Sequence, residues 1–369
     1  MDHTQITNAF AQNLRARRKE LGLSQRQLAE ALGYSPKAVS KWERAEGTAP
    51  TVLLPRLASL LHISIDSLLS AGGTPEYYLG IDGGGTKTEF VLADSTGQIV
   101  SRLVLSGCNP NDIGMPNTLK ILKEGLDTLC QTVPPNRISL FAGIAGGTTG
   151  KNRENIAEFL STYRFAACQC GSDAQNAVAS ALNKDNGLTV IVGTGTVIFV
   201  QKDQVLTKIG GFNYLFEEGG SGYMLGRDAI LHALNSEEQG NTTSPLYSLV
   251  LEKCGSATVL AHLADLYAGG KRLIASFAPL VFEAYREQDA AAAEILKRNA
   301  TVLAKQICRG AAILGTPEVK IVLVGGLTRQ EVLMNLVQQQ LPESYHITAY
   351  QGSLCVGALR LAGLEDPKC

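Results

Sequence analysis

The chain of 369 residues lacks several features that define common protein classes. Its eight cysteines include no Cys-x-x-Cys pair and no histidine at metal-binding spacing, so we expect buried, reduced thiols rather than a zinc site. It has no apolar leader segment and no uninterrupted apolar run of about 18 residues or more. With 45% hydrophobic and 18% charged residues, it is not a disordered or low-complexity chain. We therefore expect a cytoplasmic, water-soluble protein with no membrane partner.

The chain also lacks an excess of charge of either sign. It carries 33 Lys and Arg against 34 Asp and Glu, a formal net charge of -1. The distribution is uneven, because residues 1–72 hold nine basic and six acidic residues, which leaves a net charge of -4 for the remainder. A basic segment ahead of an acidic one suggests a nucleic-acid partner for the first segment alone. The length exceeds that of a typical domain of about 100–200 residues, so we expect several folding units.

The first seventy residues show short helical patterns of period 3.6 separated by turn residues. Ser24 stands at the cap position of a helix predicted over 25–32, and Gly33 marks its end. Ser35 and Pro36 then give the expected start of a third helix. Further helices are predicted over 51–61 and 64–69. Two short helices around a glycine-containing turn, the second rich in Lys and Ser near its start, are typical of a helix that enters a DNA major groove.

The sequence from Leu23 to Glu43 resembles the Cro/cI-type (XRE family) helix-turn-helix, with agreement at cap, turn and core positions. The resemblance extends over about 60 residues and implies DNA as the partner. The residues it places against bases or phosphates are Gln25, Ser35, Lys37, Ser40 and Lys41. One such domain makes few phosphate contacts, so we expect a homodimer on a two-fold-symmetric site. The alternative is a helical protein-interaction module with a solvated basic face.

Residues 71–76 combine small residues with Gly and Pro and are predicted to be a linker. After it, three apolar strands each run into a turn of small residues, which lets the backbone approach a ligand with its N–H groups open. None is a Walker loop, because no GxxxxGK[ST] occurs. Asp82, at the end of the first strand, is suited to hold a Mg²⁺-bound water beside nucleotide phosphates. The turns are Asp82-Gly83-Gly84-Gly85-Thr86-Lys87, Gly193-Thr194-Gly195-Thr196 and Gly325-Gly326.

Together the three turns resemble the phosphate and adenosine motifs of the sugar kinase, heat-shock protein 70 and actin superfamily. More closely, the segments 80–88, 142–147, 171–174, 192–195 and 210–223 look like the N-acetylglucosamine kinase branch, which is grouped with the BadF/BadG/BcrA/BcrD ATPases. The resemblance covers nearly all of residues 77–365. It implies an α/β, ribonuclease-H-like, two-lobed (actin-like) ATPase fold after the all-α helix-turn-helix domain, and ATP with Mg²⁺ as cofactors. The expected units are a DNA-binding domain over 1–70, the linker, lobe I over 77–187 and lobe II over 188–369, with a C-terminal helix at about 353–363 that returns to lobe I.

The resemblance assigns roles to individual residues. Asp173, at the start of an Ala-rich helix, matches the catalytic base, and a carboxylate fixed at a helix N-terminus suits proton acceptance from a sugar hydroxyl. The alternative for Asp173 is an ordinary helix N-cap. The turn residues Asp82 to Lys87, Gly193 to Thr196, Gly325 and Gly326 match the ATP and phosphate sites, and Asp82 is the Mg²⁺ residue, acting through water. The implied sugar-binding residues are Asn109, Gly146, Gly147, Asp173, Thr194 and Glu218.

The sequence also departs from the family pattern. Where the family shows Gly-Asp-Glu-Gly-Ser, this chain has Glu217-Glu218-Gly219-Gly220-Ser221, so ungapped alignment puts Glu218 at the Asp and Gly219 at the Glu. Phe212 replaces a Trp, and Thr148 stands where a carboxylate is common. These changes leave two interpretations open: an amino-sugar kinase fused to a DNA-binding domain, or a sugar- or nucleotide-sensing regulator with weak or lost catalysis. A third, an ATPase that drives electron transfer, needs a cysteine cluster for an iron–sulfur centre, and the cysteine spacing does not provide one. The sugar, the operator and the direction of regulation stay open.

Overall fold

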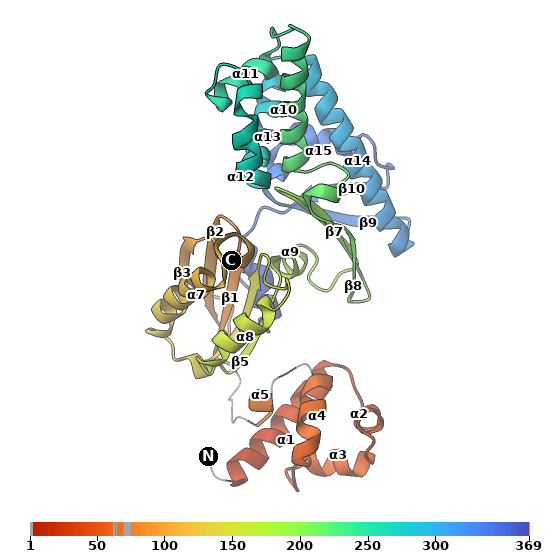
Figure 1. Ribbon diagram of the computed structural model, residues 1–369. Coiled ribbons are helices and arrows are strands. Elements are labelled where there is room, and N and C mark those ends of the chain that lie inside the picture. The colour runs from red at the N-terminus through yellow and green to blue at the C-terminus, as the bar shows by residue number, and fades with distance from the viewer. Residues whose placement is uncertain (1–2, 62, 64, 70–74, 369) are drawn as a thin grey trace. The chain divides into compact units, whose positions relative to one another are not determined.

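The computed structural model describes residues 3–61, 63, 65–69 and 75–368 (Figure 1). The chain divides into two compact units, one of residues 1–176 with 354–369 and one of residues 177–353. Within the first unit we describe separately the helical domain (residues 3–69) and the first sheet body (75–176 and 354–368); the second unit is the second sheet body. Most of the predicted linker lies outside the described residues.

The helical domain has its second and third helices at the predicted positions, whereas the segment predicted as one helix over 51–61 is a 3-10 helix (Thr51–Leu53) followed by an α-helix (Leu54–Leu60). Ser24 accepts a hydrogen bond from the amide of Gln27, whose side chain accepts one from the amide of Ser24, and Gly33 ends the helix in the left-handed region at φ 76°. Ser35 caps the third helix, with Pro36 in its first turn. The sequence predictions of these boundaries are therefore confirmed. The elements are α1 (His3–Glu20), α2 (Gln25–Leu32), α3 (Pro36–Glu43), η1 (Thr51–Leu53), α4 (Leu54–Leu60) and α5 (Ile65–Leu69).

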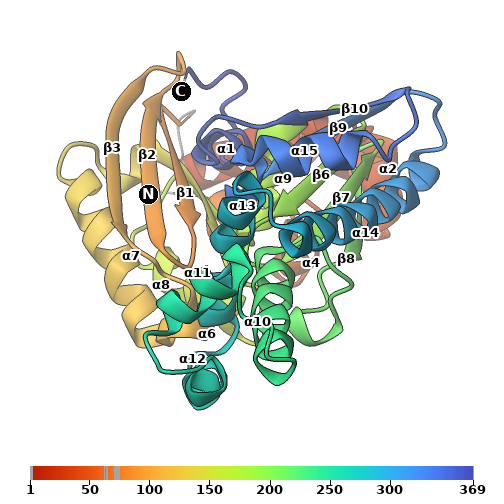
Figure 2. The ribbon, with the colours of Figure 1, turned by 90° about the horizontal axis from the view of Figure 1, so that it is seen from above.

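The first sheet body contains a five-stranded sheet of order β3-β2-β1-β4-β5. Strands β1, β2 and β3 are antiparallel neighbours that lie side by side in Figure 2, while β4 and β5 continue the sheet parallel to β1. Apolar residues of α7 and α8 pack on one face, and α16 packs on β1 and β2 with Cys355 and Leu359. The elements are β1 (Tyr77–Gly83), β2 (Lys87–Asp94), β3 (Ile99–Ser106), α6 (Pro110–Ile113), α7 (Met115–Cys130), η2 (Pro135–Arg137), β4 (Ile138–Ile144), α8 (Asn152–Ser161), β5 (Ala167–Gly171), α9 (Asp173–Ala181) and α16 (Cys355–Leu361).

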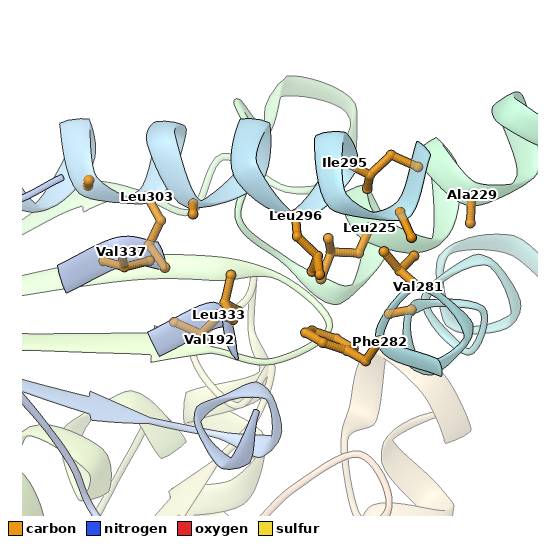
Figure 3. Packing of buried hydrophobic residues seen from close by; sticks show 14 of the residues in the cluster. Val192, Leu225, Ala229, Val281, Phe282, Ile295, Leu296, Leu303, Leu333 and Val337 are labelled. Carbon is orange, nitrogen blue, oxygen red and sulfur yellow. The ribbon is translucent and has the colours of Figure 1, made fainter. Parts of the chain in front are cut away.

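The second sheet body repeats this topology. Its sheet has the order β10-β9-β6-β7-β8, with β6, β7 and β8 antiparallel and β9 and β10 parallel to β6. Figure 3 shows side chains of α10, α13, α14 and α15 in one buried cluster that includes Val192, the last residue of β6. The elements are β6 (Gly187–Val192), β7 (Thr196–Lys202), β8 (Val205–Gly210), η3 (Tyr214–Phe216), α10 (Gly222–Glu238), α11 (Pro245–Cys254), η4 (Leu260–His262), α12 (Leu263–Ala275), α13 (Ala278–Arg286), α14 (Ala290–Leu314), β9 (Val319–Val324), η5 (Gly326–Arg329), α15 (Glu331–Gln338) and β10 (Tyr345–Ala349).

In both sheets, two strands parallel to the central strand (β1 or β6) lie on one side of it. A pair of strands joined in antiparallel fashion lies on its other side. This duplicated arrangement is the actin-like ATPase fold that the motifs predict. The structure divides the chain inside α9, after Asn176, where the sequence analysis expects a boundary at 187. Among the described helices, none combines the length and apolar character needed to cross a bilayer.

Candidate functional site

The carboxyl ends of three parallel strands bring several predicted residues to one edge of the first sheet. In the register of the sheet, Asp82 of β1 pairs with Gly143 of β4, which pairs with Gly171 of β5. The amide of Ala145 donates to the carbonyl of Gly83 over 2.7 Å and continues this alignment past the strands. The residues that follow the strand ends therefore share one edge, and they include Asp173.

Asp82 is a partly buried carboxylate held by one side chain. Asn176 donates from Nδ2 to Asp82 Oδ1 over 2.8 Å, and no other hydrogen bond reaches this carboxylate from the described residues. Burial raises the pKa of Asp82 to about 6, the charges of Asp173 and Glu89 act in the same direction, and the Asn176 hydrogen bond opposes them. A nearby cation would favour the ionised form.

The turn after Asp82 is more closed than the sequence suggests. The amide of Gly84 donates to the carbonyl of Lys87 over 2.9 Å, and the carbonyl of Gly84 accepts from Cys108. The Gly84 amide therefore closes the turn instead of remaining open for a ligand. Gly107 allows the loop to approach this turn, because a Cβ there would lie 2.2 Å from the carbonyl oxygen of Gly85. Sequence reasoning missed Gly107, whose role depends on a contact with a distant segment.

Asp173 is the first residue of α9, and the cap position belongs to Ser172. The amide of Ser172 donates to Gln175 Oε1 over 3.0 Å, while the Asp173 carboxylate accepts from the amide of Ala174 over 3.0 Å. The alternative interpretation of Asp173 as the N-cap is therefore wrong. Burial raises the pKa of Asp173 above its usual range, although backbone amides at the helix start oppose the shift. A raised pKa makes this carboxylate a stronger base once it is ionised.

A cluster of side-chain amides surrounds Asn109 at the start of α6. Asn109 Oδ1 accepts from the amide of Asn111 over 3.0 Å, while its Nδ2 has no hydrogen-bond partner among the described residues. A Cβ on Gly146 would lie 2.4 Å from Asn109 Oδ1, so the structure brings these two predicted sugar-binding residues together. Asn152 donates to the carbonyl of Gly146 over 2.9 Å and to Asn111 Oδ1 over 3.2 Å. Asn111 and Asn152 were missed, although the Asn-Pro-Asn sequence could have indicated the first.

The second glycine turn contains two amides that have no partner among the residues the structure describes. The Gly193 amide donates to the carbonyl of Gly195 over 3.0 Å and closes the turn, and the Thr196 amide donates to Glu217 Oε1 over 2.5 Å. Within the described residues, the amides of Thr194 and Gly195 have no hydrogen-bond acceptor. Of the predicted phosphate-binding residues here, these two keep open donors.

The carboxylate next to this turn is Glu217, which the sequence analysis did not select. Besides the Thr196 amide, Glu217 accepts from Ser221 Oγ over 2.7 Å, and Ser221 caps α10. Burial raises the pKa of Glu217, while these two hydrogen bonds lower it. Glu217 thereby ties the turn to the start of α10.

The predicted sugar-binding residue Glu218 is directed away from the turn at Thr194. It forms a bidentate ion pair with Arg309 of α14, at 3.1 and 2.7 Å, and its side chain is 48% exposed. It lines a surface pocket of about 650 Å³ with Lys305 and Cys308. The structure therefore brings Glu217, and not Glu218, to the turn at Thr194, because consecutive side chains in this extended segment point in different directions.

The third turn contacts the second. Gly325 has φ 122°, and a Cβ there would lie 2.4 Å from the carbonyl oxygen of Val192, the residue that precedes Gly193. Only glycine permits this approach. The predicted phosphate residues of the second body are thus neighbours, and Gly326 begins η5 beside them.

The predicted DNA-contacting residues differ in how open they are. Lys37 and Lys41 of α3 are exposed, whereas Gln25 donates to Glu43 Oε2 over 2.8 Å. Ser35 accepts from the amide of Ala38, and Ser40 accepts from Arg44, an exposed residue that the sequence analysis missed. The two lysines are therefore the members of this set without hydrogen bonds to the described residues of the domain.

Gln25 belongs to a buried ionic group behind this surface. Arg18 and Glu43 are paired at 2.5 Å with side chains 10% and 3% exposed. Burial alone would raise the pKa of Glu43, but hydrogen bonds from Arg18 and Gln25 hold it below its usual range. This group fixes α3 against α1.

The carboxylate of the first body that lies at the end of a strand beside its glycine turn is Asp82. No three His, Cys, Asp or Glu side chains of the described residues converge as a ready-made metal site. Nucleotide-bound Mg²⁺ is commonly held by one or two carboxylates together with phosphate oxygens and water. Asp82, with one oxygen bound by Asn176 and the other without a partner among the described residues, fits that requirement.

The duplicated sheets, glycine turns and carboxylates define an actin-like ATPase body behind a helix-turn-helix domain. The model of the BadF/BadG/BcrA/BcrD ATPase family matches residues 79–361, and the Helix-turn-helix family model matches residues 14–68. The chain belongs to the BadF/BadG/BcrA/BcrD ATPase family, as the motifs predict.

Known proteins similar to this chain include kinases of N-acetylglucosamine by name. The chain is 27% identical over 311 residues to the N-acetyl-D-glucosamine kinase of Dictyostelium discoideum, covering 78% of this chain and 98% of the relative. A crystal structure described as a candidate N-acetylglucosamine kinase, from Chromobacterium violaceum, matches with a TM-score of 0.64 and 25% identity, over 78% of this chain and 99% of that one. A ROK family transcriptional regulator, homologous to the E. coli MLC protein, matches over 98% of this chain and 96% of its own with a TM-score of 0.50. At 11% identity the last likeness concerns the fold alone.

Proposed function

We propose that the protein is an ATP-dependent kinase of an amino sugar, N-acetylglucosamine or a close relative, joined to a domain that binds a specific DNA sequence. The observation that carries the kinase half is the placement of two partly buried carboxylates, Asp82 and Asp173, after parallel strands at one sheet edge. Similarity to sugar kinases over most of the body supports the same conclusion.

In this proposal Asp173 accepts the proton of the sugar hydroxyl that attacks the γ-phosphate of ATP. Its burial raises its pKa, which strengthens it as a base. The open Nδ2 of Asn109 donates to the sugar, and the cluster around Gly146 holds that amide in place. These groups select and orient the acceptor.

The glycine turns supply donors for the phosphates. The open amides of Thr194 and Gly195 suit phosphate oxygens, because consecutive N–H groups in a turn form an anion-binding concavity. Asp82 would hold Mg²⁺ through a water molecule, and bound Mg²⁺ neutralises charge on the transferred phosphoryl group. Catalysis of this kind rests on positioning and charge neutralisation.

The kinase half is tested by measuring ADP release with a panel of amino sugars for the wild type and for Asp173→Ala. We expect sugar-dependent ADP release that falls by about 10²–10⁴-fold in Asp173→Ala, the range of general base catalysis, with the sugar dissociation constant changed much less. Glu218→Gln, a carboxylate paired with Arg309 away from the turn, serves as the control. Sugar binding with no Asp173-dependent ADP release contradicts the kinase.

That contradicting result would favour the second candidate, a regulator that senses a sugar or a nucleotide. The observation behind it is Gly219, which stands where the family has a Glu, together with the exposed Glu218. In the regulator, ligand binding changes the affinity for DNA, and reciprocally DNA changes the affinity for the ligand. Measuring sugar affinity with and without bound DNA separates this coupling from catalysis.

For the DNA half we propose that two copies of the chain bind a two-fold-symmetric site through α3. The exposed Lys41 makes a phosphate contact, so Lys41→Ala should weaken binding to a DNA fragment selected by the full chain, and reduce the slope of affinity against salt by about one. Lys19→Ala, an exposed lysine on α1, is the control. Unchanged DNA binding in Lys41→Ala would show that a different helix contacts DNA, and sedimentation with and without DNA tests the dimer.

A further inference from the structure

Asn176 is a buried amide one turn into α9 that no motif marks. Its side chain is completely buried. Nδ2 donates to Asp82 Oδ1 over 2.8 Å and to the carbonyl of Ile81 over 3.0 Å, and it lies 3.4 Å from the carbonyl oxygen of Gly143. Since an amide nitrogen has two hydrogens, the two short contacts are the principal hydrogen bonds and the third is the weakest.

The surroundings of Asn176 are built to accept it. A Cβ on Gly143 would lie 2.3 Å from Asn176 Oδ1 and 2.4 Å from Nδ2, so only glycine at that position leaves room for the amide. All the neighbours of Nδ2 are acceptors, which fixes the amide orientation. The bonded groups belong to β1 and the neighbouring glycine to β4, so Asn176 is held at the same sheet edge as Asp82.

The oxygen of the Asn176 side chain lowers the stability of the fold, which a residue with a purely structural role would avoid. Asn176 Oδ1 is buried and has no hydrogen-bond partner in the part of the chain that the structure describes. A buried acceptor without a partner lowers stability, and an apolar side chain of the same shape would remove that penalty. The hydrogen bonds that Asn176 Nδ2 donates therefore explain why an amide side chain stands at this position.

We propose that Asn176 is a positioning residue for phosphoryl transfer, which orients the Asp82 carboxylate for a nucleotide-bound divalent cation and fixes it relative to Asp173, three residues earlier in the same helix. The inference rests on the proposed function and adds a residue to it. Asn176 acts through Asp82 and contacts no substrate. One helix thus carries both the base and the residue that sets the carboxylate for the cation.

The test uses Asn176→Leu, which keeps the branched shape of the Asn176 side chain and removes its donors, with the smaller Asn176→Ala as a second variant. Ser139→Ala is the matched control, because Ser139 Oγ donates a buried hydrogen bond to the carbonyl of Ala362 over 2.5 Å in the same body, away from Asp82. Each full-length variant is compared with the wild type in kcat, KM for the sugar, and thermal midpoint. Calorimetry gives the affinity for ADP with Mg²⁺ and for ADP with EDTA.

We expect kcat, and the affinity for ADP with Mg²⁺, to fall by about 10–100-fold in Asn176→Leu, the usual effect of losing a hydrogen bond to a metal-holding carboxylate. Affinity for ADP in EDTA and KM for the sugar should stay within about twofold, because Asn176 acts on the carboxylate alone. If the Asn176 variants do not fold, Gly143→Ala takes their place, because its Cβ would displace the Asn176 amide. We expect it to lower kcat and the affinity for ADP with Mg²⁺ in the same way.

Two results would overturn the inference. One is a folded Asn176→Leu with the kcat and Mg²⁺-dependent ADP affinity of Ser139→Ala. The other is a lower thermal midpoint with neither quantity changed, which makes Asn176 purely structural. If the wild type shows no sugar-dependent ADP release, the proposed kinase activity is contradicted instead. The calorimetric comparison of the variants still decides the role of Asn176. If the wild type does not bind ADP with Mg²⁺, both the proposed kinase activity and the proposed role of Asn176 are contradicted.

Discussion

The glycine turns of the two sheet bodies follow the same strand in the same topology but obtain their carboxylates differently. Asp82 directly precedes the glycines of the first turn within β1, whereas the residue that directly precedes Gly193 in the second turn is the apolar Val192. The second turn receives Glu217 from a loop 21 residues along the chain, through the Thr196 amide. A duplicated fold therefore repeats the backbone of the turn, while the acid beside it comes from different parts of the sequence.

The difference extends to what each carboxylate does. Asp82 accepts one hydrogen bond, from Asn176, and keeps an oxygen without a partner among the described residues. Glu217 accepts from the Thr196 amide with one oxygen and from Ser221 with the other. The first carboxylate is open to a cation, and the second is consumed in holding the loop. We therefore expect the carboxylate of the first turn to take part in phosphoryl transfer and that of the second turn to maintain the conformation of the loop.

Among the changes to the carboxylates beside the two turns, Asp82→Asn should give the largest effect. It keeps the shape of the side chain and removes the negative charge, so kcat should fall by about 10²–10³-fold, as when one electrostatic group of a transition state is removed. Initial rates at several Mg²⁺ concentrations measure it. A rate near that of the wild type would show that the two turns do not differ in the way described.

The pH dependence of the rate should report Asp173. Because burial raises the pKa of Asp173 and the base acts when ionised, the acidic limb of kcat should lie above the usual Asp range, with about a tenfold loss per pH unit below it. The rate is therefore lost as pH falls through the raised pKa. The profile of wild-type kcat tests this, and a limb at or below the usual Asp pKa would contradict it.

Glu217→Gln should give a smaller effect, of about tenfold in KM for ATP with a modest change in kcat. Gln can still accept from the Thr196 amide with its one oxygen, but its amide nitrogen cannot accept from Ser221 Oγ, so the turn loses part of its anchor and one hydrogen bond of about 1 kcal/mol. Steady-state kinetics with varied ATP measure the change. A loss in kcat as large as that of Asp82→Asn would assign Glu217 to the chemistry.

Glu218→Gln should give the smallest effect, less than about twofold in kcat and KM, because an exposed ion pair contributes about 0–1 kcal/mol. Its partner Arg309 lies on α14, and the Glu218 side chain is 48% exposed. The same kinetic measurements apply. A large rise in KM for the sugar would restore Glu218 to the sugar site that the sequence alignment gives it.

Local signals predicted the parts of the molecule that depend on neighbours in sequence. The caps at Ser24 and Ser35 and the left-handed Gly33 fall where predicted, since capping acts over three or four residues. The assignment of Glu218 shows the limit. Alignment cannot distinguish two adjacent glutamates by the direction of their side chains, and only the fold shows that Glu217 meets the Thr196 amide.

The sequence by itself determined the family, the helix-turn-helix, the three glycine turns and the position of Asp82 at a strand end, because these depend on short-range spacing and backbone geometry. The tertiary structure alone decided that Asn176 holds Asp82 across 94 residues of chain, that Gly143 leaves room for it, and that Glu217 anchors the second turn. Hydrogen bonds between distant segments depend on which strands pair, and parallel partners are separated by long connections in the sequence, so short-range spacing does not predict these contacts.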